Sequence, residues 1–325
     1  MNNKNRSIAL IAGLIGLIAC LGFVAFNLMQ DMKSREVYED TASKVQITAT
    51  PTPMPEPEED SSLTVEELDA QEFTGVREGE ESKLPPDIFS GRGNPIDFAK
   101  LTDINPDLYA WVRIEGADID YPVAQHPTDD IYYLNHDLYG DVAVAGCVFT
   151  QYYNKKDFSD PMTVLYGHNM ADGQSMFASL HWYEDVDFFN KNRYCYIYTA
   201  DKIRVYDIFS TRPYPDLNLM TSIDLKDKQV LADYIKEIFE TRNMESNLRD
   251  GVEVTTEDRL ITLSTCINGQ PQNRFLVTGK LVWEGTEAEL EKEEALIAAQ
   301  QAAENPADAV VEPASDEATV PEATE

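Results

Sequence analysis

The chain has 325 residues, of which 58 are Asp or Glu and 26 are Lys or Arg, so its formal net charge is −32 at pH 7. Such an acidic chain could not neutralise a run of phosphates, which argues against nucleic acid as a partner. Half of the acidic residues lie in two flanks, 16 of them at 31–87 and 13 at 284–325. The segment between them, residues 88–283, is about 190 residues long and suits one compact domain.

Residues 8–26 form an unbroken run of apolar or small side chains, preceded by Lys4 and Arg6. A helix over this run would span roughly 28 Å at about 1.5 Å per residue, close to the hydrocarbon thickness of a bilayer. We therefore expect residues 1–30 to be a signal anchor with a cytoplasmic N-terminus, although Lys33 and Arg35 also flank the run. A cleaved signal peptide and a lipoprotein modified at Cys20 are the alternatives.

Residues 31–87 are polar and acidic, with prolines at every second position over 51–57. Alternating prolines prevent helix and sheet formation, so we expect an extended linker that holds a folded domain away from the bilayer. Simple disorder is compatible with this interpretation. At the other end, residues 286–289 form a capping box that predicts a helix to about residue 303, followed by a disordered acidic tail. Residues 31–87 and 304–325 are expected to be dispensable for activity, so that a chain of about 88–303 should fold and remain active.

The region between the flanks, residues 88–283, is predicted to consist mainly of β-strands. A short helix is expected around 95–101, and a turn with a helix start at 105–107. A longer helix is expected at 225–241, where apolar residues share one face. Strands are expected at 110–114, 119–123, 142–149, 163–166, 195–199, 203–211, 260–264 and 275–283. Eight strands with turns between them suggest a closed barrel or a sandwich, and periodicity does not choose between these two.

Candidate catalytic residues lie just after the strands expected at 163–166 and 260–264 and just before the strand expected at 275–283. Residues 260–264 alternate apolar and small polar side chains, and Cys266 stands at the end of this strand. Arg274 follows eight residues later, and the apolar stretch at 164–166 runs into Gly167 and His168. A thiolate is a competent nucleophile, an imidazole can pass its proton to a leaving amine, and an arginine can stabilise an oxyanion. These three groups at strand ends predict a thiol active site.

The remaining Cys and His residues are less informative. We expect Cys147 and Cys195 to be small buried side chains, with a disulfide between them as the alternative. The other histidines, His126, His136 and His181, lack a comparable setting. No zinc-binding spacing is present among the Cys and His residues, so neither a metal nor another cofactor is expected.

Several motifs together resemble the sortases, the membrane-anchored cysteine transpeptidases of Gram-positive bacteria. The principal ones are TLSTC at 262–266, YGHNM at 166–170 and NRFLV at 273–277. Supporting motifs are NPDLYAWV at 105–112, IDYPV at 119–123 and YYL at 132–134. The resemblance covers about 95–283. The helix at 225–241 lies where class B sortases carry an inserted helix, which favours class B.

This resemblance implies a closed eight-stranded sortase-type β-barrel, with N-terminal helices and an inserted helix before the catalytic strand. It implies that the catalytic residues are His168, Cys266 and Arg274. The resemblance also implies that four residues line the peptide-binding groove: Asp130, Leu134, Ser264 and Thr265. This sequence departs from many sortases at Ile267, where they have an acidic residue after the cysteine. A catalytic calcium ion is not implied.

The resemblance further implies the reaction and its partners. A sorting-signal peptide of a surface protein would be cut after a threonine and become a thioester of Cys266. An amine of a peptidoglycan precursor or of a pilin would then resolve it, on the outer side of the cell membrane. Two alternatives stay open. One is a non-catalytic surface binding module on the same fold, and the other is a simple cysteine peptidase, a thiol protease in which water resolves the thioester.

Overall fold

A computed structural model describes residues 3–47, 82, 88, 93–217, 219–241 and 243–304, without the side chains of 3–15, 27, 28, 31 and 302–304. Most of the linker predicted over 31–87, namely residues 48–81 and 83–87, and the acidic tail after residue 304 lie outside the described residues. The chain divides into two compact units, residues 1–54 with 94–286 and residues 55–93 with 287–325. The second unit contains α7 (Glu287–Glu304), in which the Gln300 side chain donates to the Ser82 carbonyl at 3.1 Å.

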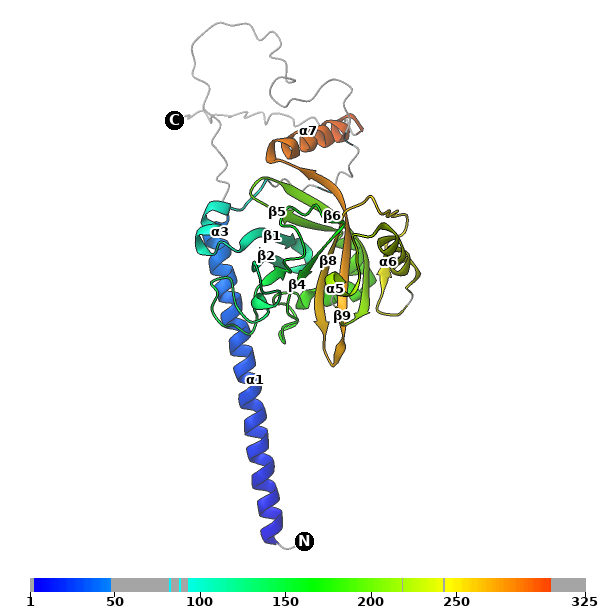
Figure 1. The fold of residues 1–325 in the computed structure, drawn as a ribbon. Coiled ribbons are helices and arrows are strands. Elements are labelled where there is room, and N and C mark those ends of the chain that lie inside the picture. Colours follow the sequence, from blue (N-terminus) through cyan, green and yellow to red (C-terminus); the bar gives the residue numbers. More distant parts are fainter. Residues whose placement is uncertain are drawn as a thin grey trace, which may run out of the picture. The chain divides into compact units, whose positions relative to one another are not determined.

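The first unit is built on one sheet that closes on itself. Its strands are β1 (Leu108–Ile114), β2 (Ile119–Ala124), β3 (Val148–Thr150), β4 (Met162–Tyr166), β5 (Tyr194–Tyr198), β6 (Ile203–Pro215), β7 (Asn247–Leu248), β8 (Leu260–Ile267) and β9 (Gln270–Gly285). They pair in the order β5-β1-β2-β3-β4-β8-β9-β6-β7, and β6 also pairs with β5 (Figure 1). The second pairing closes eight strands into a barrel, which confirms the fold that the resemblance implied. The two-residue β7 adds only to β6.

Short helices connect these strands. They are α3 (Phe98–Ile104), η1 (Glu115–Ala117), η2 (Tyr132–Leu134), η3 (Ala178–Glu184), α4 (Val186–Lys191) and α5 (Leu219–Ser222). The predicted helix at 225–241 is observed as α6 (Lys228–Glu240), and it begins after Asp227, whose carboxylate accepts from the backbone amides of Gln229 and Val230. This helix lies between β6 and β8 in the chain, where the inserted helix was expected.

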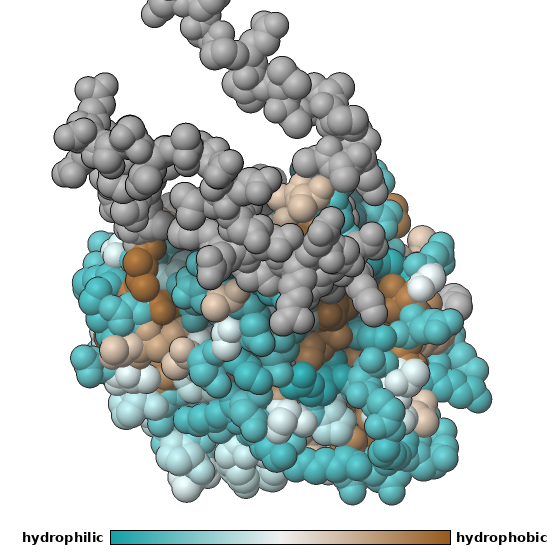
Figure 2. All heavy atoms as spheres, turned by 90° about the horizontal axis from the view of Figure 1, so that it is seen from above, coloured by the Kyte–Doolittle hydropathy of each residue, from teal (hydrophilic) through white to brown (hydrophobic). Residues whose placement is uncertain are grey.

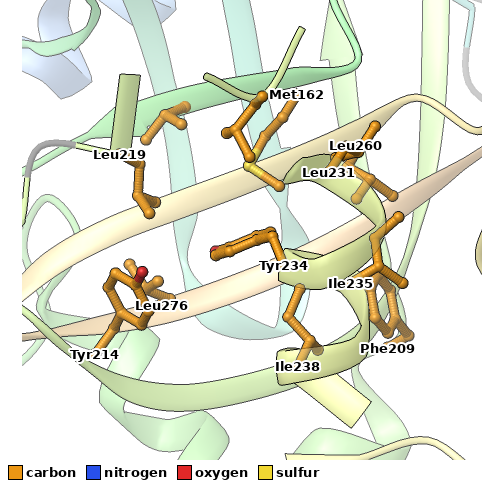
Figure 3. Packing of buried hydrophobic residues seen from close by; sticks show 12 residues of the cluster. Met162, Phe209, Tyr214, Leu219, Leu231, Tyr234, Ile235, Ile238, Leu260 and Leu276 are labelled. Atoms are coloured by element: carbon orange, nitrogen blue, oxygen red, sulfur yellow. The ribbon is translucent and has the colours of Figure 1, made fainter. Parts of the chain in front are cut away.

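One face of α6 covers the outside of the barrel (Figure 3). Leu231, Tyr234, Ile235 and Ile238 are buried in a cluster that the strands complete. The strand residues in this cluster include Met162 and Val164 of β4, Phe209 and Tyr214 of β6, Leu260 of β8 and Leu276 of β9. Each fully buried side chain of this size contributes about 1.5–3 kcal/mol. The cluster therefore fixes β4 and β8, the two strands whose ends carry His168 and Cys266.

The helix at the N-terminus is longer than the sequence predicted. Residues 31–45, expected to begin an extended linker, continue α1 (Asn3–Val45) without a break. Tyr38, Thr41 and Val45 are buried, and the spacing of three and four residues places them on one helical face. The Tyr38 hydroxyl donates to the Gly146 carbonyl. Burial of this stripe on the first unit explains why a polar, charged sequence is helical here.

The end of α1 is hydrogen-bonded to the segment that precedes α3. The Ile47 amide donates to the Pro95 carbonyl at 2.7 Å, and the Asp97 amide donates to the Val45 carbonyl at 2.7 Å. Residues 45–47 and 95–97 therefore lie side by side. The C-terminal part of α1 contacts this unit directly, and Figure 1 shows the N-terminal part of the helix running away from the strands.

Two smaller expectations were wrong. Of the strand expected at 142–149 only Val148 and Phe149 belong to β3, because Gly146 adopts φ +58° in a turn and Val142 remains 83% exposed. Residues 105–107 do not start a helix. Asn105 instead ends α3, and its side-chain oxygen accepts from the Asp107 amide at 3.0 Å, which turns the chain into β1.

The described surface in view in Figure 2 is mainly hydrophilic, as the high acidic content leads one to expect. Within the part of the chain that the structure describes, no helix is both long enough and apolar enough to cross a bilayer. The side chains of residues 8–15, the first part of the predicted membrane segment, lie outside the described residues.

Candidate active site

Strand pairing brings the three predicted catalytic residues to one edge of the barrel. β4 and β8 are parallel neighbours, and their last pair is Tyr166 with Ser264. Residues two positions further along each chain, His168 and Cys266, therefore emerge at the same edge. β8 and β9 are antiparallel, and Cys266 lies directly opposite Arg274. The thiol and the guanidinium thus come from β8 and β9, and the imidazole follows the adjacent β4 by two residues.

Gly167 allows the chain to approach this edge closely. A Cβ atom at this position would lie 2.6 Å from the ring of Phe177, so only glycine fits without a shift of the ring. The Gly167 amide donates to the Ser264 carbonyl at 3.1 Å, and the Thr265 hydroxyl donates to the Gly167 carbonyl at 2.8 Å. These bonds continue the contact between the two chains beyond the last ladder pair. They hold His168 in register with Cys266.

The orientation of the His168 ring follows from one hydrogen bond. Its Nε2 lies 2.6 Å from the Leu134 carbonyl oxygen. A carbonyl can only accept, so Nε2 carries the proton and Nδ1 holds the lone pair of the neutral ring. Nδ1 is then the nitrogen that can exchange a proton with a thiol. The Leu134 carbonyl therefore orients the His168 imidazole, and the predicted role of Leu134 in substrate binding stays a prediction.

A groove runs along this edge of the barrel. The residues lining it are mainly apolar: Ile131, Leu134, Phe149, Tyr166, Tyr214, Pro215, Leu217, Leu219 and Leu276. The polar lining includes Gln151, Ser264 and Thr265, and His168, Cys266 and Arg274 lie along it with Asp216. Of the predicted substrate-binding residues, Leu134, Ser264 and Thr265 line the groove. Their contacts with a substrate stay a prediction.

Asp130 is not among the residues that line the groove. Its carboxylate lies near the backbone amide of Tyr152, at 3.4 Å. Partial burial raises the pKa of Asp130, and the hydrogen bond from Tyr152 opposes this shift. The Asp130 side chain thus contacts the backbone at Tyr152. Its direct role in substrate binding stays a prediction.

Arg274 is already engaged within the groove. Its Nη2 lies 2.9 Å from Oδ1 of Asp216, and its Nη1 donates to the Asn273 carbonyl at 3.2 Å. The side chains of Arg274 and Asp216 are 27% and 43% exposed, so the ion pair is accessible to solvent and to a ligand. The guanidinium has five N–H donors, and these two contacts use only part of them.

The cysteines differ in accessibility. Cys266 is exposed at the end of β8, whereas Cys147 and Cys195 are buried and free. The alternative of a disulfide between them is therefore wrong. Burial raises the pKa of Cys147 to about 12 and also raises the pKa of Cys195. Both stay protonated at neutral pH and are inert, while the Cys266 thiol can be reached from the groove.

A second histidine, His181, lies at this site, although the sequence shows no active-site setting for it. His181 of η3 has its Nε2 2.9 Å from the Cys266 carbonyl, and Asn169 donates its Nδ2 to the same oxygen at 2.9 Å. His181 and Glu184 are three residues apart, a spacing that the sequence could have shown. Nothing in the sequence, however, linked this pair to Cys266.

Comparisons with known proteins agree with this geometry. The family described as "Sortase domain" matches residues 112–282. Sortase B of Listeria monocytogenes is 34% identical over 194 residues, which cover 57% of this chain and 74% of that protein. Sortase B of Staphylococcus aureus is 30% identical over 190 residues, with the same two coverages of 57% and 74%.

Solved structures give the same result. The structure of Clostridium perfringens sortase B superposes with a TM-score of 0.52 at 31% identity, covering 57% of this chain and 100% of that chain. A Staphylococcus aureus sortase B–substrate complex superposes with a TM-score of 0.51 at 27% identity, covering 57% and 84%. The matching family, the closed barrel and the shared edge of Cys266, His168 and Arg274 together show that this chain belongs to the sortase family, in its class B of cysteine transpeptidases.

Proposed function

We propose that this transpeptidase uses Cys266 as its nucleophile on a sorting-signal peptide bound in the groove. The thiolate attacks a peptide carbonyl carbon, the C–N bond of the peptide breaks, and a thioester of Cys266 remains. An acceptor amine then attacks the thioester carbon and passes a proton to His168, a new amide bond forms, and the thiolate leaves. The observation that carries this proposal is the exposed Cys266 at a groove that His168 and Arg274 also line.

His168 and Arg274 have separate roles in this proposal. His168 takes the thiol proton at Nδ1 and gives it to the departing amine, while its Nε2 remains bonded to the Leu134 carbonyl. Arg274 lies opposite Cys266 on β9, and its guanidinium donates to the carbonyl oxygen that becomes negative in the tetrahedral intermediate. Asp216 fixes the plane of that guanidinium.

The substrate and acceptor are proposed from the resemblance and from the relatives. The Staphylococcus aureus structure is described as a substrate complex of sortase B, which supports a peptide substrate for this chain. The apolar wall of the groove suits apolar side chains of an extended peptide. The proposed acceptor is an amine of a peptidoglycan precursor or of a pilin.

We further propose that the enzyme acts outside the cell and is anchored through residues 8–26. The support is the apolar run itself and the basic residues that precede it. A fusion of a reporter to residue 31 tests this topology. Protease access from outside the cell supports the anchor, and a cytoplasmic reporter contradicts it.

The alternatives lead to different products. A transpeptidase joins the peptide to an added amine, whereas a thiol protease of the hydrolase class releases the free acid with or without amine. A non-catalytic binding module forms neither product, and its Cys266 is not selectively alkylated. Mass spectrometry of the products, with and without an added glycine peptide, separates the three. We expect Cys266→Ala to lower kcat/KM at least about 10⁴-fold while the melting temperature is unchanged.

A further inference from the structure

The carbonyl group of Cys266 is held by two side chains from outside its own strand. Asn169, in the loop after β4, and His181, in η3, each approach this oxygen at 2.9 Å. The pairing of β8 with β9 becomes irregular between Cys266 and Ile267. The backbone of the nucleophile thus lies where the ladder loses its regular register. Two donors converge on it from other elements.

His181 is itself fixed on two sides. Its ring stacks on Phe275, with centroids 4.9 Å apart and an interplanar angle of 27°. Phe275 is fully buried and lies opposite Thr265, next to the pair of Cys266 with Arg274. On the other side, Nδ1 of His181 lies 2.6 Å from Oε1 of Glu184. The ring therefore has a defined plane and a defined rotation.

The donor and acceptor chemistry of these contacts is specific. The Cys266 carbonyl can only accept a hydrogen bond, and so can an ionised Glu184. Both contacts of His181 are hydrogen bonds when both ring nitrogens carry protons, and the ring then forms an ion pair with Glu184. With both nitrogens protonated, the histidine donates in two directions. It cannot act as a base for the thiol while these bonds persist.

We propose that His181, oriented by Glu184, is a positioning residue that holds the backbone of Cys266 so that its thiol stays in register with His168. This proposal rests on the proposed function of Cys266 as the nucleophile. Asn169 shares the same task, since it donates to the same oxygen and directly follows His168. Displacement of a reacting group by about 1 Å can lower a rate on the order of 10²-fold. The loss of one of two donors should therefore lower the rate without unfolding the barrel.

The test compares substitutions that keep or remove the donor. Glutamine places its amide nitrogen near the position of Nε2 and can still donate, whereas alanine cannot. We expect His181→Ala to lower kcat at least about 10-fold with little change in KM, and His181→Gln to stay within about 3-fold of the parent chain. Trp182→Ala is the matched control, because it removes a neighbouring η3 side chain that packs on Phe188. It should lower the melting temperature and leave kcat nearly unchanged.

A second readout does not depend on turnover. Cysteine labelled with ¹³C at the carbonyl gives one resonance for each cysteine, and the one absent from Cys266→Ala identifies Cys266. That resonance should move in His181→Ala and remain close to its original position in His181→Gln. An unmoved resonance, or a kcat of His181→Ala within 3-fold of the parent, would overturn the proposal. If the parent chain itself cleaves no sorting peptide, the proposed function fails while the carbonyl readout still tests the contact.

Discussion

Arg274 and Asp216 form an ion pair inside the groove, with 2.9 Å between Nη2 and Oδ1. Both side chains are partly exposed, and ion pairs of this kind contribute about 0–1 kcal/mol to stability. The pair therefore contributes little to folding, and its place in the groove with Cys266 supports the role proposed for Arg274. The pair fixes the guanidinium plane and leaves further donors for a substrate oxygen.

Arg274→Lys and Arg274→Ala should both lower kcat/KM by at least about two orders of magnitude, with Lys retaining somewhat more activity. Lysine keeps the charge but loses the planar fork and part of the reach. Kinetics and melting temperatures of both variants check this. If Arg274 only pairs with Asp216, Lys largely restores the rate, and any loss follows the melting temperature.

Asp216→Ala should lower kcat/KM about 10-fold, because the guanidinium loses the carboxylate that orients it. Asp216→Asn retains an acceptor oxygen and should lose less. A double-mutant cycle with Arg274→Lys measures the coupling between the two residues. Additive effects would show that Asp216 acts independently of Arg274.

Glu284 provides a pH test of the barrel. Its carboxylate bonds Arg204, Lys202 and Arg259, and the side chain is only 17% exposed. Burial raises the pKa of Glu284, but hydrogen bonds from Arg259 and Lys202 and the charges of Arg204 and Arg259 outweigh it and lower the pKa to about 2. Because the pKa is depressed in the folded state, the ionised carboxylate stabilises the protein at neutral pH.

This contribution is present above the unfolded pKa of about 4.5 and is lost as the pH falls toward about 2. It amounts to at most about 3 kcal/mol. Glu284→Gln should therefore be less stable than the parent chain at pH 6, and the difference should shrink as the pH approaches 2. Urea denaturation at several pH values measures this. A difference that stays constant with pH would mean that the charge of Glu284 does not stabilise the fold.

The docked part of α1 should contribute to stability. Tyr38→Ala removes a buried side chain and should destabilise the first unit by about 3 kcal/mol. Met32→Ala, on the same helix but 71% exposed, is the matched control and should have no effect. A chain that begins at residue 94 loses the whole stripe and should melt at a lower temperature than one that begins at residue 31. Equal melting temperatures would contradict the observed docking.

The elements that were predicted correctly are those that local sequence patterns determine. Alternation placed β8 correctly, and the apolar run into Gly167 placed His168 just after β4. Periodicity and turn residues therefore predicted the positions of Cys266 and His168, whereas their catalytic roles stay a prediction. Closure of the barrel depends on the pairing of β5 with β6, a long-range contact that periodicity does not contain. The closed barrel was predicted from the resemblance to sortases.

The features that were predicted wrongly or not at all have a common physical cause. Residues 31–45 carry too many charges for the sequence to predict a packed helix, and among their described side chains only Tyr38, Thr41 and Val45 are buried. Val142 and Val144 alternate with alanines as in a strand, but Gly146 turns the chain before a ladder can form. His181 reaches Cys266 only through the fold. In each case tertiary contacts, and not local preference, decide the outcome.

Intact-mass measurement after mixing the enzyme with a sorting peptide tests the account most directly. In the absence of an acceptor amine, the parent chain should gain the mass of the N-terminal peptide fragment. Hydroxylamine should remove this mass, since it cleaves thioesters, and Cys266→Ala should never gain it. Cleavage of the peptide by Cys266→Ala, or an adduct on another residue of the parent chain, would contradict the account.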